Sequence, residues 1–195
     1  MIEVYPLFSK PIMTLSIDVS SVDLSNIKWG KNYTNSISTS QNVLELEEFS
    51  TLKKECYNGL NEYFYNIMSS TPDTEIYITE SWFNKTDKDQ VHHRHWHPNS
   101  IVSAIVYIDT EIGQGGETMF ITSSYNTIEY DIQQPNLYNS KSWSLPPIPG
   151  QMLLFPSDTE HLVETYRGET PRISLSFNTF VKGNISKQAL THLSI

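Results

Sequence analysis

The segment IPGQMLLFPSDTEHLVETYRGETPRISLSFN, residues 148–178, contains two strand-like runs on either side of a histidine. The first run, QMLLF, follows Pro149 and Gly150, a pair that is typical of turns. The second run begins at Arg172, which follows His161 by 11 positions. We therefore predict two strands, with His161 between them in the chain.

Alternation along the second run separates a polar face from an apolar one. Successive side chains of a strand point to opposite faces, so every second residue lies on the same side. The polar side carries Arg172, Ser174, Ser176 and Asn178, and the other side carries Ile173, Leu175 and Phe177. Such a strand suits the wall of a polar cavity inside a barrel. The same pattern also fits an outer sheet whose polar side faces water.

The remaining sequence predicts a mainly β fold with one helix near the N-terminus. Between residues 44 and 68, apolar side chains recur at steps of three and four, the spacing of one helical face. From Glu75 onward, short runs rich in β-branched and aromatic residues alternate with turn residues. The expected strands are EIYITESWF, IVSAIVYI, ETMFIT, NTIEY, QMLLF and RISLSFNTF, and residues 109–116 and 133–150 are expected connections. This pattern favours a sandwich or a barrel.

The length and composition suit a single domain. The 195 residues include 38% hydrophobic and 12% aromatic residues, enough to fill one core. We expect residues 1–195 to form one domain with three parts. These are an N-terminal region at 1–74 with the amphipathic helix, a β core at 75–182 and a loosely attached tail at 183–195.

The charge and the hydropathy pattern argue against several partners. A net charge of -9 and a pI near 5.0 disfavour duplex DNA and anionic membranes, because such partners select basic surfaces. No apolar run approaches the roughly 18 to 20 residues that cross a bilayer, and the first 20 residues lack the features of a signal peptide. We expect a soluble, cytoplasmic protein.

Four of the six histidines lie in QVHHRHWHPNS, residues 90–100, and the chain has a single cysteine, Cys56. One cysteine forms no internal disulfide and no cysteine-based zinc site, so a metal here would be bound by histidine, carboxylate or water. His93, His95 and His97 would share one face of a strand. Alternatively, the cluster is a solvated tract that binds metal weakly, or one or two of its members are ordinary hydrogen-bonded surface histidines.

Residues 75–181 resemble the iron(II)- and 2-oxoglutarate-dependent dioxygenases, in particular their prolyl-hydroxylase-like branch. Six motifs occur in the order typical of that family. They are the pair His95-x-His97, the strand end Tyr107-Ile108-Asp109, the Gly-Gly-Glu-Thr turn at 115–118, the Pro-Gly turn into a strand ending at Phe155, the distal His161, and Arg172-x-Ser174.

The resemblance implies a double-stranded β-helix, a cupin-like jelly roll, as the core. Its open end would hold iron(II) on three protein ligands and leave three positions for 2-oxoglutarate and O2. The reaction implied is hydroxylation of a peptidyl side chain or a small molecule, with release of succinate and carbon dioxide. Arg172 would bind the far carboxylate of 2-oxoglutarate, with Ser174 and the Tyr107 hydroxyl beside it. Tyr107 also fits an aromatic residue at the edge of the core.

The first ligand pair departs from the family pattern, which has His-x-Asp or His-x-Glu. His97 places a neutral ligand where a carboxylate normally lies, which would leave the site one negative charge short. Two alternatives are that His93 and His95 form the pair, or that chloride or water replaces the missing oxygen ligand. We predict His95, His97 and His161 as metal ligands, because the distance from His97 to Tyr107 fits the family's strand.

The substrate is not defined by these motifs. Trp82, Asn84, His93 and Asn178 are candidates for substrate contact or for positions around the metal ligands, and Trp96 and Trp143 are candidates near the mouth of the cavity. Two other functions remain open: a cupin-like three-histidine dioxygenase that does not use 2-oxoglutarate, and a jelly-roll binding module without activity. Arg172 distinguishes the first of these, because that chemistry does not require a partner for a dianion.

Overall fold

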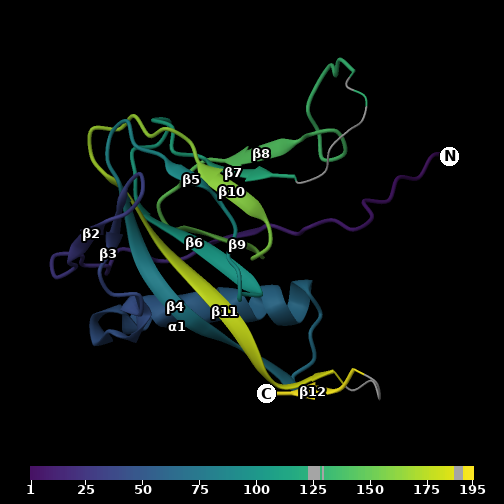
Figure 1. Ribbon diagram of the computed structural model, residues 1–195, viewed down its shortest axis with the longest axis horizontal. Helices are drawn as coiled ribbons and strands as arrows, with labels where there is room; N and C mark the ends of the chain where they lie inside the picture. The colour runs from purple at the N-terminus through teal and green to yellow at the C-terminus, as the bar shows by residue number, and fades with distance from the viewer. Residues whose placement is uncertain (123–127, 129, 187–190) are drawn as a thin grey trace.

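The computed structural model describes residues 1–122, 128, 130–186 and 191–195, which form two antiparallel sheets and one helical segment (Figure 1). The elements in chain order are β1 (Met13–Ser16), β2 (Trp29–Lys31), β3 (Ser36–Ser38), η1 (Val43–Glu45), η2 (Glu47–Phe49), α1 (Ser50–Asn61), η3 (Glu62–Ile67), β4 (Thr74–Thr86), β5 (His92–His95), β6 (Val102–Asp109), β7 (Thr118–Ile121), β8 (Ser142–Leu145), β9 (Gln151–Pro156), β10 (Glu160–Val163), β11 (Arg172–Ser186) and β12 (Leu193–Ser194).

The two sheets differ in size and in the part of the chain that forms them. The larger sheet has the order β1-β9-β6-β11-β4-β3-β2, with β12 paired to β11. The smaller sheet has the order β5-β10-β7-β8. Strands far apart in the chain are therefore neighbours, as in the jelly roll that the resemblance implied, and the mainly β, jelly-roll fold class is confirmed.

The helical segment covers the outer face of the larger sheet (Figure 1). Cys56 and Leu60 of α1 belong to the same buried cluster as Met152 and Leu154 of β9. The intervening β9 residue, Leu153, belongs to a second cluster on the other face of the sheet. Both faces of β9 are therefore buried, which explains its unbroken apolar run.

The second cluster lies between the two sheets and fills one part of the space between them with apolar side chains. It contains Ile105, Tyr107, Phe120, Leu153 and Phe155. Along β11, the predicted alternation places Leu175 and Phe177 in the helix-side cluster, while the polar face points toward the smaller sheet. The polar face of β11 therefore lines a cavity and does not face bulk water.

The helix is interrupted where the sequence predicts one continuous amphipathic element at 44–68. Two 3₁₀ turns precede α1, and α1 continues into the π-helical η3. The amide of Met68 donates to the carbonyl of Tyr63, five residues earlier. Tyr63 and Phe64 are both buried, as the spacing of three and four predicts, whereas Ile67, the last residue of the predicted face, is 48% exposed.

Both ends of the chain pair with the β core. β1 pairs with β9, and β3 pairs with β4, so the N-terminal region adds strands that the sequence patterns do not indicate. β12 pairs with β11, so residues 193–194 are attached to the sheet, contrary to the loose tail expected there. The predicted strand NTIEY, residues 126–130, lies largely outside the described residues. In the described part of the chain, no helix has the length and apolar character needed to cross a membrane.

Candidate active site

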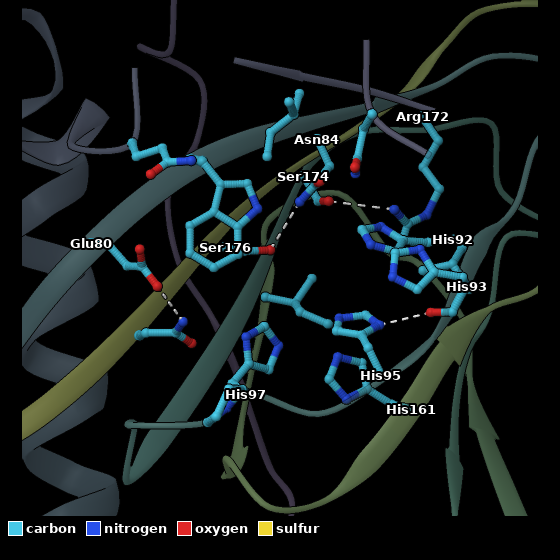
Figure 2. A pocket seen from close by; sticks show the side chains of 18 residues that line it. Glu80, Asn84, His92, His93, His95, His97, His161, Arg172, Ser174 and Ser176 are labelled. Carbon is cyan, nitrogen blue, oxygen red and sulfur yellow. Dashed lines mark hydrogen bonds between the residues drawn. The ribbon is translucent and has the colours of Figure 1, made fainter. Parts of the chain in front are cut away.

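A cavity of about 340 Å³ opens between the two sheets (Figure 2). The larger sheet lines it with β4, β6 and β11, and the smaller sheet with β5 and β10. Asn32, Ile37 and Gln41 complete the wall from the N-terminal region. The site therefore includes a part of the chain to which the sequence assigned no functional role.

Three of the predicted residues, His95, His97 and His161, meet at this cavity. Their ligand nitrogens all lie within 4.8 Å of one another. His95 and His161 are partners in the β5–β10 pairing, and their ring centroids lie 4.3 Å apart. His97 follows the end of β5, where its amide donates to the carbonyl of Ser157. These residues, which we call the histidine triad, form an arrangement that can hold one metal ion.

Hydrogen bonds to backbone carbonyls orient two rings of the triad. Nδ1 of His95 lies 2.7 Å from the carbonyl oxygen of His93, and Nδ1 of His161 lies 3.0 Å from that of Thr159. A carbonyl oxygen only accepts, so each Nδ1 carries the proton and each Nε2 keeps a free lone pair. Such bonds hold the ring and the tautomer in the state that binds metal.

Burial keeps the triad neutral. It lowers the pKa of His161 to about 3 and that of His97 to about 4, and neighbouring histidines add to the effect. The pKa of His95 is also lowered by burial. Imidazole must be neutral to bind a metal, so at neutral pH the three rings can bind an ion without first losing protons.

A second histidine group shares one member with the triad. The ligand nitrogens of His92, His93 and His95 also lie within 4.8 Å of one another. The β5–β10 register shifts between the pairs His95↔His161 and His92↔Val163, so β5 contains one extra residue there. Such a bulge places His92 on the same side as His95, although strict alternation would separate them. Sequence alternation therefore missed His92, which lines the cavity.

Both groups consist only of histidines in the described part of the chain. No carboxylate completes either of them, so the departure from the His-x-acid pattern is a property of the folded site as well as of the sequence. A metal held here would have neutral protein ligands.

Arg172 lies at one end of the cavity and is only 1% exposed (Figure 2). Its Nε donates to the carbonyl of Gly116 at 3.0 Å, and Nη1 lies 3.4 Å from Oγ of Ser174. Nη2 is buried without a hydrogen-bond partner. No carboxylate of the described residues forms an ion pair with Arg172, and burial lowers the pKa of the guanidinium group. A buried cation with an unused donor is a strong attractant for an anion.

The ring of Tyr107 packs against the guanidinium group of Arg172, and Tyr107 is not among the residues that line the cavity. The guanidinium carbon lies 5.0 Å from the centre of the Tyr107 ring. The Tyr107 hydroxyl lies 2.8 Å from Oγ1 of Thr118, and the side chain is fully buried. Direct contact between Tyr107 and a cosubstrate stays a prediction, whereas Ser174 does line the cavity.

The residues proposed from sequence for substrate contact lie around the cavity. Trp82, Asn84, His93 and Asn178 all line it. Trp96 is 56% exposed and Trp143 is 43% exposed, and neither belongs to the cavity wall. Glu80 also lines the cavity, and no sequence motif pointed to it.

A jelly roll with a histidine triad at its cavity and a buried arginine defines a class of metal-dependent oxygenase. The sequence model of the putative 2OG-Fe(II) oxygenase family matches residues 80–178, which is about half of the chain. No curated protein matches the sequence. The chain belongs to the 2OG-Fe(II) oxygenase family, whose members are oxidoreductases that use iron(II), 2-oxoglutarate and O2.

Solved structures share the fold at low sequence identity. A prolyl-4-hydroxylase from Pseudomonas putida has a TM-score of 0.58 and 13% identity, over 87% of this chain and 93% of that chain. HygX from Streptomyces hygroscopicus, with nickel and 2-oxoglutarate bound, has a TM-score of 0.58 and 12% identity, over 87% and 82%. An oxidoreductase of the 2OG-Fe(II) oxygenase family from Burkholderia pseudomallei has a TM-score of 0.56 and 16% identity, over 80% and 72%.

Proposed function

We propose that the histidine triad holds iron(II) and that Arg172 binds the far carboxylate of 2-oxoglutarate. The observation that carries this proposal is the buried guanidinium group of Arg172, which has an unused donor and no anionic partner among the described residues. A dicarboxylate that reached from Arg172 to the triad would supply that partner. The buried charge of Arg172 also argues against a three-histidine dioxygenase that does not use 2-oxoglutarate, because such an enzyme would not require a cation to bind a dianion.

The donor set fits iron(II). Imidazole nitrogens with open positions beside them suit this ion, and no thiolate competes, since Cys56 is buried in the helix-side core. Bound iron(II) supplies the redox chemistry that couples decarboxylation of 2-oxoglutarate to hydroxylation of a substrate. The protein orients the triad through the carbonyls of His93 and Thr159, and it shields the cosubstrate from water by burying Arg172.

The second histidine group is a competing ligand set. His95 has only one free nitrogen, because its Nδ1 donates to a carbonyl, so it cannot serve both groups at the same time. His161 is 2% exposed and lies opposite His95 in the sheet, whereas His93 is exposed. The triad is the more buried of the two groups, so we assign the metal ion to it. His92 and His93 then lie around the metal site.

The substrate that we propose is a peptidyl side chain or a small molecule. Structural neighbours include a prolyl-4-hydroxylase and a protein crystallised with hygromycin B, so the fold accommodates both classes. The cavity wall beyond the triad offers Trp82, Asn84 and Asn178 for contact with either. Turnover would release succinate and carbon dioxide.

The proposal is tested by anaerobic titration of the purified protein with iron(II) and then with 2-oxoglutarate. Changing His95, His97 or His161 to Ala should remove most of the iron affinity, because two imidazoles hold an ion poorly. His93→Ala is the matched control and should retain iron. Loss of iron in the His93 variant alone would show that we chose the wrong group.

Arg172→Met should leave iron binding nearly intact and weaken 2-oxoglutarate binding by about a hundredfold, since a buried charge-assisted contact contributes on the order of 3 kcal/mol. Arg172→Lys should recover part of the affinity, because lysine keeps the positive charge but cannot form the bidentate hydrogen bonds of a guanidinium group. If iron-loaded wild-type protein neither binds 2-oxoglutarate nor forms succinate, the assignment fails and a binding module without activity takes its place.

A further inference from the structure

We propose that the half of the cavity beyond the histidine triad binds a positively charged group of the substrate, an alkylammonium or a guanidinium, with Glu80 as its partner. This inference rests on the proposed function, because it names the class of molecule that the same cavity would present to the metal.

Glu80 and Arg172 lie at opposite ends of the cavity (Figure 2). The pairing of β4 with β11 places Arg172 opposite Thr86 and Asn178 opposite Glu80. Arg172 and Asn178 are six residues apart on one strand, which corresponds to roughly 20 Å at about 3.3 Å per residue. A cosubstrate that reaches from Arg172 to the triad therefore leaves Glu80 free for another molecule.

A buried polar network fixes the position of Glu80. Oε1 of Glu80 accepts a hydrogen bond from Nδ2 of Asn178 at 2.7 Å, and Oδ1 of Asn178 accepts one from Oγ of Ser103 at 2.8 Å. Oγ of Ser103 in turn lies 2.8 Å from Oγ of Ser157. Asn178 is 5% exposed and Ser103 is 1% exposed. A carboxylate held by such a network has little rotamer freedom to lose when it binds a ligand.

The negative charge of Glu80 has no cationic partner in the part of the chain that the structure describes. Each ion pair found there joins other residues. The hydrogen bond that Glu80 accepts from Asn178 comes from a neutral amide, and it reaches only Oε1 of the carboxylate. A half-buried carboxylate with free acceptor capacity, facing a cavity, suits a ligand that brings both a positive charge and N–H donors.

Two other groups on β4 strengthen the preference for a cation. Trp82 precedes Asn84 on the same face of β4 and lines the cavity between Glu80 and the triad, with its ring 6.0 Å from that of His97. An indole face beside a carboxylate attracts ammonium and guanidinium groups. Asn84 lies opposite Ser174, toward the Arg172 end, and its buried Oδ1 has no partner, so it offers a further acceptor to a ligand that extends from Glu80 toward that end.

The charge of the whole chain acts in the same direction. A net charge of -9 raises the local concentration of cationic molecules and repels anionic ones. An anionic substrate would meet both this field and Glu80. Among the described residues that line the cavity, Arg172 alone carries a fixed positive charge, and the cosubstrate would use it.

The test measures binding of three probes to protein loaded with zinc(II) and 2-oxoglutarate, so that no turnover occurs. The probes are the N-acetyl methylamides of lysine, norleucine and glutamate, and titration calorimetry gives each dissociation constant. We expect the lysine probe to bind most tightly, and Glu80→Gln to weaken it about tenfold, since the amide keeps the contact with Asn178 and removes only the charge.

The matched control is Glu75→Gln on the same strand. Glu75 pairs with Lys182 at 2.9 Å and its side chain is 60% exposed, so the change should leave lysine-probe binding unaltered. The proposal is overturned if the norleucine or glutamate probe binds as tightly as the lysine probe, if the lysine probe does not bind up to its solubility limit, or if Glu80→Gln has no effect. Prior titration with 2-oxoglutarate separates these outcomes from failure of the proposed function, because that step does not involve Glu80.

Discussion

Arg172 depends on a glycine that leaves room for it. Gly116 has φ +75, and a Cβ there would lie 2.9 Å from Cδ of Arg172 and 3.0 Å from a ring carbon of Tyr166. Gly113 in the same connection has φ +81, and a Cβ there would meet nothing within 4 Å. The two glycines share an unusual backbone conformation, but only Gly116 packs against the guanidinium side chain.

Gly116→Ala should lower 2-oxoglutarate affinity by about tenfold, because the new methyl group displaces Arg172 from its contact with the carbonyl of residue 116. Gly113→Ala should lose about 1 kcal/mol of stability from the positive φ alone and keep its 2-oxoglutarate affinity. Urea unfolding and 2-oxoglutarate titration of both variants give the comparison. Equal loss of affinity in the two variants would point to the connection itself and not to the Arg172 contact.

At the scale of the elements, α1 packs against β9 at a glycine. Gly59 of α1 faces Met152 of β9, and a Cβ at Gly59 would lie 2.2 Å from Cε of Met152 and 3.2 Å from a methyl carbon of Leu15. Met152 is fully buried, so its side chain has little space into which it can move. The glycine therefore lets the helix lie close to the outer face of the sheet.

Gly59→Ala should destabilise the protein by about 1 kcal/mol. Alanine favours a helix by about 1 kcal/mol over glycine, and overpacking of a full core costs about 1 to 3 kcal/mol, so the cost exceeds the gain. Asn58→Ala, at the preceding exposed position, should instead stabilise the protein by a few tenths of a kcal/mol. Chemical denaturation of the two variants measures both values. A stabilised Gly59 variant would mean that Met152 moves freely.

At the scale of the whole molecule, the N-terminal region and the β core are joined by strand pairing and by the cavity wall. β1 pairs with β9 and β3 with β4, and Asn32, Ile37 and Gln41 line the cavity. We infer that residues 1–74 and 75–182 fold as one unit. The buried histidines then link the stability of this unit to pH.

The metal-free protein should lose stability as the pH falls below about 6.5. Burial lowers the pKa of His92 to about 2, of His97 to about 4 and of His161 to about 3, whereas in the unfolded chain these rings take up protons near pH 6.5. The unfolded state therefore binds more protons in this window, and the free energy of unfolding falls by about 1.4 kcal/mol per pH unit for each such ring.

His92→Gln in the metal-free protein should reduce that slope by about 1.4 kcal/mol per pH unit between roughly pH 5.5 and 4, because one such ring is removed. The wild-type protein, measured in the same way, is the reference. Urea unfolding at several pH values, with a chelator present, gives the slopes. Identical slopes for wild type and the His92 variant would show that His92 takes up its proton in the folded state.

Much of the fold and part of the candidate site follow from local sequence patterns. Alternation along β11 predicted that Arg172, Ser174 and Asn178 share a polar face, and these residues do line one cavity. The same reasoning brought His95 and His97 together, and the family resemblance added His161. Strand alternation is a property of neighbouring residues in the chain, so a local pattern suffices to determine it.

The tertiary structure alone decided which other groups reach the site. The bulge in β5 depends on the register against β10, so it reversed the side on which His92 was expected to lie. Glu80 became a cavity residue because β4 pairs with β11 across a gap of almost 100 positions in the chain. The hydroxyl of Tyr107 is hydrogen-bonded to the hydroxyl of Thr118, which lies on another strand. Register and pairing depend on contacts between distant segments, which local periodicity does not encode.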